Sequence, residues 1–353
     1  MSTPTIKDVA KRAGVGVGTV SRVVAGKGPV SEKTAKRVRK AIEELKFRPS
    51  HAARALQTGQ SQTIGVFVPL IKGSFYTPIL HAIYTSLLAG GRHMVVVFGQ
   101  TLENERREAL EGAQFLVDKG CDGLLMVATA LQQKDIESLM HLKSCLSLLN
   151  RSFPRYTDRC FFPDHEAAGA IAARTLWDAG HRRLAVIEGP KLSLDNTLRM
   201  RGFFNVLAGH GVDIGGIPRV CGDFSPESGW AGAQEVLSGR NKFTALFCAN
   251  DEMAMGALSY LQKAGISVPR DLSVMGYDGI DVSMFTAPPL TTVLVPWREI
   301  AVNALNHLLN CCYNAGLPVE RNLPAQMLWR DSVARIGNAV QTKRSRLASS
   351  DVF

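Results

Sequence analysis

The chain lacks the features that mark several classes of protein. It has no run of about eighteen consecutive apolar residues, which argues against a membrane-spanning helix. The opening MSTPTIKDVAKR lacks the apolar run of a signal peptide, so we expect a protein that is not exported. The seven cysteines are odd in number and none forms a CxxC pair. This pattern predicts reduced cysteines in a cytoplasmic protein, with no disulfide framework.

Sequence motifs of catalysis are also missing. The chain has no Walker loop, no HExxH and no GxSxG. The histidines are isolated from one another, and we expect them to be surface or capping groups: His51, His81, His93, His141, His165, His181, His210 and His307. We therefore predict that the protein is not an enzyme and needs no metal or cofactor. The competing hypothesis is a sugar-processing enzyme with a fused regulatory domain.

Acidic residues are scarce at the start of the chain. Residues 1–60 hold 13 Lys and Arg against 4 Asp and Glu, a net charge of +9. Residues 61–340 hold 25 against 26, and residues 341–353 hold 3 against 1. The excess positive charge is therefore concentrated in one small module. A concentrated basic module is typical of proteins that bind nucleic-acid phosphates.

The same module has the periodicity of three short helices. Thr5 and Asp8 have capping-box spacing, and Gly14 marks the end of the first helix. A tight turn separates it from a second helix, whose polar or small residues Gly18, Ser21 and Arg22 face outward. A third helix begins after Ser31. Two short helices joined by a turn and supported by a third form the helix-turn-helix plan.

From residue 61 onward, short apolar runs alternate with longer amphipathic segments. The runs predicted as buried strands are 63–69, 93–99, 123–128, 146–150, 184–189, 245–251 and 272–279. The segments predicted as helices are 77–91, 103–120, 135–142, 198–211, 228–239 and 252–265. This alternation predicts two successive α/β lobes with parallel sheets. Ligands in such sheets bind at the carboxyl ends of the strands, here between the lobes.

Polar and aromatic residues occur where ligand-binding side chains are expected. Asn150, Asn250 and Asp278 come after predicted strands, and Arg199 is near the start of a helix. Carboxylate, amide and guanidinium groups can each bond two neighbouring hydroxyls. The aromatic residues that could stack on a sugar ring are Phe75, Tyr76 and Phe224. These residues predict a site for a polyhydroxylated ligand.

The segment TIKDVAKRAGVGVGTVSRVVAGKGPVSEKTAKRVRKAIEEL resembles the DNA-binding headpiece of the lactose/galactose repressor (LacI/GalR) family of bacterial transcription regulators. The following FRPSHAARALQTGQSQTIGV resembles that family's hinge helix and the entry into its effector domain. The resemblance implies a helix-turn-helix domain at 1–48, a hinge helix at 49–60, an effector-binding and dimerisation body at 61–340, and a polar tail at 341–353.

The resemblance also implies which residues meet DNA. Base edges in the major groove would be read by Val17, Gly18 and Arg22, while Thr5, Thr19 and Ser21 would contact phosphates. In the hinge helix, which includes Ala53, the side chain of Leu56 would enter the minor groove and kink the duplex. Arg suits guanine O6 and N7. Gly16 stands where the family usually has Ser, so one phosphate-contacting hydroxyl is absent.

Over the body the family resembles periplasmic sugar-binding proteins, whose chain crosses three times between two lobes. We place the crossings near 161–163, 290–293 and 323–327. This gives a first lobe of about 61–161 plus 293–323 and a second of about 163–290 plus 327–340. The segments LLNRSFPRY and FTALFCANDEMAMGAL are similar to the galactose-repressor branch. The resemblance implies that Arg199, Asn250 and Asp278 contact the effector.

These observations predict a transcriptional regulator, in the form of a repressor of carbohydrate-utilisation genes, located in the cytoplasm at the nucleoid. A homodimer is expected on a palindromic duplex operator, with helices at 74–90 and 273–290 as candidate interface material. A small sugar or glycoside is the expected effector. The alternatives are a purine effector, an additional protein corepressor, or a solute-binding protein that feeds a transporter.

Overall fold

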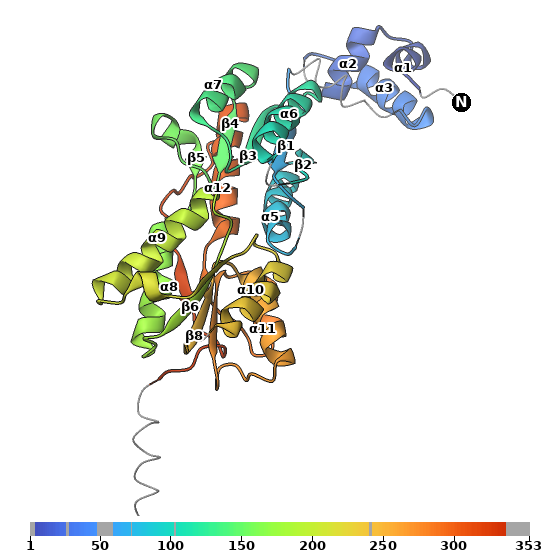
Figure 1. Cartoon of the computed structure of the whole chain (residues 1–353). Helices are drawn as coiled ribbons and strands as arrows, with labels where there is room; N and C mark the ends of the chain where they lie inside the picture. Colours follow the sequence, from blue (N-terminus) through green and yellow to red (C-terminus); the bar gives the residue numbers. More distant parts are fainter. Residues whose placement is uncertain are drawn as a thin grey trace, which may run out of the picture. The chain divides into compact units, whose positions relative to one another are not determined.

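The computed structural model describes residues 4–25, 28–47, 59–71, 73–101, 104–239 and 242–336. Two units make up the chain, Met1–Thr63 and Ile64–Phe353. The described elements of the first are helices, apart from Thr63 at the start of the first strand, and the second is an α/β body with two sheets (Figure 1). Within the described residues, no helix has the length and apolar character needed to cross a membrane.

In its described residues, the first unit has the helices α1 Ile6–Ala13, α2 Val17–Ala25 and α3 Glu32–Glu44. The backbone N–H and the hydroxyl of Thr5 both donate to the Asp8 carboxylate, at 2.8 and 2.7 Å. This interaction confirms the capping function predicted for the pair. Gly14 ends α1 with a φ of 62°, a conformation that glycine adopts without steric cost.

One buried valine from each helix forms the centre of this unit. Val9 of α1, Val20 of α2 and Val38 of α3 have no exposed surface, and small alanines fill the space around them. Val23 and Val24 of α2 are half-buried against this core, and Val17, Gly18 and Arg22 of the same helix are exposed. The fold is the predicted helix-turn-helix with a supporting third helix.

The first sheet of the body has the strand order β2-β1-β3-β4-β5. Its strands are β1 Thr63–Val68, β2 His93–Phe98, β3 Gly123–Val127, β4 Leu146–Leu149 and β5 Cys160–Phe161. The pairs β1–β3, β3–β4 and β4–β5 are parallel. Its helices are α5 Tyr76–Ala89, α6 Glu105–Asp118, α7 Gln133–Leu142 and α12 Trp297–Tyr313. Val66 belongs to the buried cluster that includes α5 and α12, whereas Phe67 belongs to the cluster of α6 and α7. The helices therefore cover both faces.

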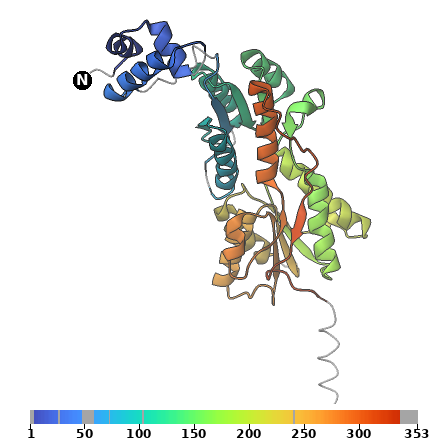
Figure 2. The same cartoon turned by 180° about the vertical axis from the view of Figure 1, so that it is seen from behind.

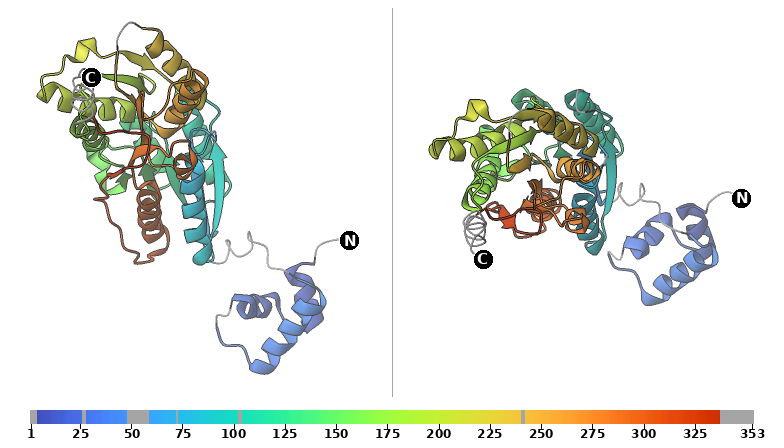
Figure 3. Two further views of the ribbon diagram at one scale, coloured as in Figure 1. Left: turned by 90° about the horizontal axis from the view of Figure 1, so that it is seen from below. Right: turned by 60° about the horizontal axis from the view of Figure 1, so that its bottom comes forward.

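The second sheet has the order β11-β10-β9-β8-β6-β7. Its strands are β6 Leu184–Glu188, β7 Arg219–Cys221, β8 Ala245–Cys248, β9 Ser273–Asp278, β10 Thr291–Leu294 and β11 Gln326–Leu328. The pairs are parallel except β10–β11, which is antiparallel. The helices α8 His165–Asp178 and α9 Leu194–Gly209 lie on one side, and α10 Pro226–Ser238 and α11 Asp251–Lys263 on the other (Figure 1, Figure 2). Figure 3 shows the same layers from two further directions.

The chain passes between the two sheets three times. The passages lie between β5 and α8, between β10 and α12, and between α12 and β11. The second passage differs from the expected position, because residues 291–294 pair in parallel with β9. Val293 and Leu294 therefore belong to the second sheet, and the chain leaves it at Val295 and Pro296. Several elements were not predicted from the sequence: α8, α12, β5, β7, β10 and β11.

Two glycines bring α8 and α9 into close backbone contact. A Cβ on Gly169 of α8 would overlap the backbone carbonyl of Arg199, and a Cβ on Gly202 of α9 would overlap that of Glu166. Side chains cannot be inserted at either point without moving a helix backbone. The position of Arg199 therefore depends on the absence of side chains at this crossing.

We expect Gly169→Ala to destabilise the body by about 1–3 kcal/mol, because the added methyl group forces the two helices apart. Gly209→Ala is the matched control, since no heavy atom lies within 4 Å of a Cβ at that end of α9. Urea unfolding of both variants would measure the difference. Equal stability of Gly169→Ala and the wild-type protein would contradict the assigned packing.

Candidate functional site

Helix α2 presents an outward surface made of the predicted DNA-contacting residues. Val17, Gly18 and Arg22 are exposed, and Thr19 and Ser21 are half-buried. Thr5, at the start of α1, is also exposed. The aliphatic part of the Arg22 side chain lies beside Gly28, where a Cβ would be 3.3 Å from Arg22 Cδ. Ala53 and Leu56, predicted in the hinge helix, lie outside the described residues.

Charge pairing distinguishes Arg22 from other cations of this unit. Arg12 pairs with Glu44 at 2.6 Å, and Arg39 pairs with Glu32 at 3.4 Å. In the described part of the unit, Arg22 forms no such ion pair. A guanidinium without an internal partner can bond to a guanine edge or a phosphate at no cost to the fold.

In the body, three of the predicted effector-binding residues have a left-handed backbone. The φ angle is 61° at Asn150, 70° at Phe224 and 111° at Asp278. Asn150 follows β4, Phe224 follows β7 by three residues, and Asp278 ends β9. Residues other than glycine adopt such angles at a cost of about 1–3 kcal/mol, and they cluster at functional sites. The strain therefore makes the ends of these strands a candidate site.

Arg199, on α9, is the most deeply buried cation described in the body. Its side chain is 2% exposed, and its guanidinium carbon lies 3.6 Å from the ring centroid of Tyr277 and 5.8 Å from that of Phe224. One Nη1–H donates to the carbonyl of Ala249. The Nε–H has no partner among the described residues. A buried unpaired donor is costly, so this N–H points to an acceptor supplied by a ligand.

Asp278 lies near Arg199 and is almost fully buried. Burial raises the pKa of its carboxyl well above the ordinary value, and the positive charge of Arg199 acts in the opposite direction. The indole N–H of Trp297 donates to Asp278 Oδ1 at 3.2 Å. Trp297 is the first residue of α12, so this bond joins the second sheet to the helix that covers the first.

An aromatic cluster surrounds the same place. The ring of Phe75 meets that of Trp297 edge-on at 5.2 Å and that of Tyr76 at 4.9 Å. Burial raises the pKa of Tyr76, and the negative charges of Glu105, Asp195, Asp278 and Glu252 raise it further. The predicted residues Phe75 and Tyr76 therefore belong to a region that is rich in carboxylates.

Asn250 has a supporting role in this arrangement. Its side-chain oxygen accepts from the N–H of Met253 at 3.0 Å, which caps α11. Its side-chain N–H donates to the carbonyl of Phe224 at 2.9 Å. The amide therefore holds the strained backbone of Phe224 in place from the end of β8.

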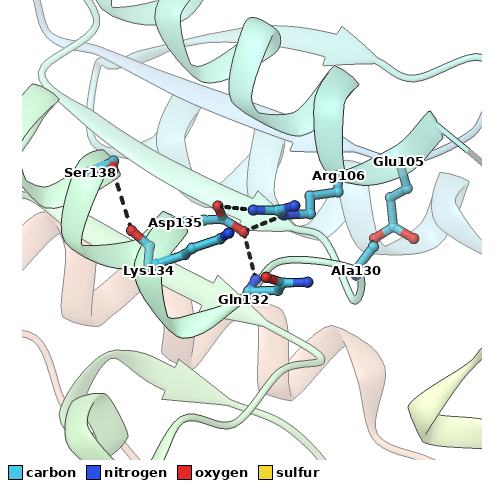
Figure 4. Close-up of polar contacts among 7 residues, drawn as sticks. All are labelled: Glu105, Arg106, Ala130, Gln132, Lys134, Asp135 and Ser138. Atoms are coloured by element: carbon cyan, nitrogen blue, oxygen red, sulfur yellow. Dashed lines mark hydrogen bonds and ion pairs between the residues drawn. The ribbon is translucent and has the colours of Figure 1, made fainter.

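Glu105 comes from the first lobe and was not predicted as a site residue. Its carboxylate accepts from the N–H of Ala130 at 3.0 Å and from the hydroxyl of Thr129 at 3.2 Å. Burial raises its pKa. Its neighbour Arg106 turns to Asp135 and donates to both carboxylate oxygens at 2.7 Å (Figure 4). These bonds fix the loop that follows β3 against the start of α6.

Glu252 is another carboxylate that was not predicted, and it links the two lobes. Glu252, in the first turn of α11, accepts a hydrogen bond from the backbone N–H of Ser74, which precedes α5. A Cβ on Gly73 would overlap the Glu252 carboxylate, so glycine is needed for this approach. The start of α11 in the second lobe is therefore bonded to the loop before α5 in the first.

Comparisons with known proteins show the family to which the chain belongs. A family model described as bacterial regulatory proteins, lacI family, matches residues 5–50, and a periplasmic binding protein-like domain matches residues 173–333. The HTH-type transcriptional regulator AscG of Escherichia coli is 31% identical over 332 residues, which is 93% of this chain and 98% of that relative.

The chain belongs to the LacI family. A solved LacI-family regulator from Burkhoderia phymatum is 42% identical, with a TM-score of 0.74 over 78% of this chain and 100% of the other. The lac repressor dimer bound to operator and the anti-inducer ONPF is 28% identical, with a TM-score of 0.83 over 94% of this chain and 100% of the other. The headpiece and two-lobed body are those of a LacI-family DNA-binding transcriptional regulator.

The surface or capping position predicted for the histidines is wrong for His165 and His181, the second of which is 1% exposed. His165 was expected at the surface or at a cap, but it is 3% exposed and lies between Asn150 and Tyr277. A pattern of isolated histidines gave no sign of this position. Asp195 and Trp297 were also missed. Asp195 could have been found, because it precedes Arg199 by one helical turn on α9 and so lies on the same face.

We expect Asp251 to make the stability of this LacI-family body depend on pH. Burial raises the pKa of its carboxyl to about 7. Hydrogen bonds from Thr292 and Ile280 lower the pKa but do not outweigh the effect of burial. A carboxyl with a raised folded-state pKa stabilises the fold below its unfolded pKa and loses that contribution as pH rises through 7.

The free energy of unfolding of the wild type, minus that of Asp251→Asn, should therefore fall between pH 4 and 7 and level off above. Urea unfolding across this range would measure it. Asp271→Asn is the control, because Asp271 is exposed and the bond from Arg270 lowers its pKa, so its pKa shifts in the opposite direction to that of Asp251. A difference that does not change with pH for Asp251→Asn would contradict the assignment.

Proposed function

We propose that this LacI-family protein is a repressor of carbohydrate-utilisation genes, controlled by a small sugar or glycoside that binds between the lobes. The buried Nε–H of Arg199, which has no partner among the described residues, carries the proposal. The carboxylate of Asp278 feels the charge of Arg199, and the carboxylates of Asp195, Asp278 and Glu105 act on the neighbouring Tyr76. A guanidinium needs acceptors and a carboxylate needs donors, and a hydroxyl group supplies both.

Relatives of this chain support a sugar as the effector class. A ribose operon repressor of Escherichia coli is 32% identical over 307 residues. A CelR regulator solved as a cellobiose complex and an Enterococcus faecium regulator solved with bound ribose share the fold, with TM-scores of 0.66 and 0.68. The aromatic rings of Phe75 and Phe224 can stack on the apolar face of such a ring.

A homodimer on a palindromic operator is part of the proposal. Large apolar side chains are exposed on α5, where Tyr84 is 47% and Leu88 is 55% exposed. Met284 and Phe285, in the 3₁₀ segment Asp281–Phe285, are 50% and 77% exposed. Clustered exposed apolar residues mark association surfaces. We place the dimer contacts on these two segments, within the candidate stretches 74–90 and 273–290.

Domain and site assignments follow from the same family membership. We assign DNA binding to 1–48, a hinge helix to 49–60, and effector binding and dimerisation to 61–340. The nucleoid in the cytoplasm is the proposed location. A purine effector is the second candidate, since the repressor PurR of Photobacterium profundum is 32% identical over 308 residues. A thermal-shift screen of monosaccharides, glucosides, disaccharides and purines separates the two, because a bound ligand raises the melting temperature.

Arg22→Ala should lower affinity for a selected operator by about 1–3 kcal/mol and relax specificity at one base pair. Arg39→Ala removes the same charge from α3, where Arg39 pairs with Glu32, and serves as the control. Fluorescence anisotropy on operator and random duplexes would measure both variants. If the two lost equal affinity on both duplexes, Arg22 would be acting only through charge.

Arg199→Gln and Asp278→Asn should each abolish the effector-induced change in operator affinity while operator binding itself persists. The reason is that each variant leaves buried ligand hydroxyls without matching partners. Arg201→Gln is the control, because Arg201 lies on the same helix but pairs with Glu166 at the surface. Calorimetry showing wild-type effector affinity in both variants would place the site elsewhere.

A further inference from the structure

His165 lies at the centre of a hydrogen-bonded chain that joins the two lobes. Its Nε2 is 2.8 Å from Oδ1 of Asn150, which follows β4 in the first lobe. Its Nδ1 is 2.9 Å from the hydroxyl of Tyr277, which belongs to β9 in the second. The Asn150 backbone N–H donates to the carbonyl of Phe161 at 2.8 Å, so Asn150 is held from both its backbone and its side chain.

The position of His165 in the chain places it beside the passages between the lobes. It is the first residue of α8, directly after the first passage, and its ring centroid lies 5.9 Å from that of Trp297, directly after the second. Trp297 in turn bonds to Asp278 and contacts Phe75. Segments near a pivot keep their contacts while the lobes rotate, so these two rings can transmit the geometry of one lobe to the other.

The charged groups at the ends of this hydrogen-bonded chain determine which atom donates and which accepts in each of its bonds. Burial lowers the pKa of His165 to about 4, helped by the positive charge of Arg199 and opposed by Asp195 and Asp164. The imidazole is therefore neutral near pH 7 and has one donor and one acceptor. The Asn150 amide nitrogen, 3.5 Å from Oδ2 of Asp195, donates to that carboxylate.

It follows that Asn150 Oδ1 accepts from His165, whose proton must be on Nε2. Nδ1 then accepts the O–H of Tyr277. The face of the Tyr277 ring is covered by the Arg199 guanidinium at 3.6 Å. The hydrogen-bonded chain therefore begins beside Arg199 on α9, passes through Asn150 in the first lobe, and ends at Asp195, which is also on α9.

We propose that His165 is a positioning residue that couples the effector-contacting side chains of the two lobes and thereby sets how strongly an effector changes operator affinity. The coupling to the effector rests on the proposed function, whereas the hydrogen-bond pattern of His165 does not. A ligand that bonds to Arg199 or Asp195 perturbs one end of the chain, and Asn150 in the other lobe responds because each bond has a fixed direction.

The bonding pattern is tested without any effector. In ¹⁵N-histidine-labelled full-length protein, the His165 signals, assigned by comparison with His165→Phe, should show a proton on Nε2 and a hydrogen-bonded Nδ1 from pH 8 down to about 5.5. In Tyr277→Phe the Nδ1 signal should move to the position of an acceptor that has lost its donor. A proton on Nδ1, or a charged ring at neutral pH, would overturn the proposal.

The coupling is tested by operator titrations with and without the sugar or purine found in the thermal-shift screen. Tyr277→Phe and His165→Phe should each reduce the effector-induced change in operator affinity about fivefold or more, with operator affinity alone unchanged. In the double variant, the effector-induced change in operator affinity should be reduced no further than in the more affected single variant, because both substitutions break the same hydrogen-bonded chain.

His181→Phe is the matched control. His181 is equally buried and also bonds at both nitrogens, to Thr244 at 2.9 Å and to the carbonyl of Ala334 at 3.0 Å, but both partners lie in the second lobe. The His181→Phe variant should therefore keep the wild-type effector-induced change in operator affinity. The same unreduced change in Tyr277→Phe would overturn the proposed coupling. If no compound changes operator binding of the wild type, the proposed function fails, and the ¹⁵N signals alone decide whether the chain exists.

Discussion

The burial of the Arg199 guanidinium is the constraint on which the body's site depends. A cation removed from water requires compensation. The Arg199 guanidinium donates to the carbonyl of Ala249 and lies over the face of the Tyr277 ring, and it forms no ion pair with a carboxylate among the described residues. Its placement requires α9 to approach α8 so closely that Gly169 can carry no side chain. Helix packing in the second lobe thus decides the chemistry at the end of its strands.

The carboxylates of this buried region would be costly if all were ionised. The fold limits the cost in two ways. Asp278 and Glu105 have pKa values raised by burial, and each still accepts from a fixed N–H: Trp297 for the first and Ala130 for the second. The result is a set of acceptors and a donor held at fixed positions: Asp278 by a strained strand end, and Glu105 and Arg199 by helices. Such pre-organised groups bind a ligand with little loss of conformational freedom.

Local features of the fold could be predicted from the sequence, and contacts across the lobes could not. Thr5, Asp8 and Gly14 act within one helix, so their spacing sufficed. Arg199 and Asp278 were identified because they follow a strand or begin a helix and match a family pattern. His165, Trp297 and Glu252 were missed because their partners are 15 to 178 positions away in the chain. The helix α12 was missed as well, since neither its start nor its return to the second sheet shows in a local pattern.

The same distinction explains why Asn250 and His165 differ from what their residue types suggested. Asn250 was chosen as a ligand contact, and its amide caps α11 and holds the carbonyl of Phe224. His165 was set aside, and it connects the two lobes. Both residues act on the site through their neighbours, by fixing Phe224 in one case and Asn150 in the other. In a two-lobed regulator the response to a ligand depends on such residues, because a ligand can shift the arrangement of the lobes only through groups that are positioned differently in the two states.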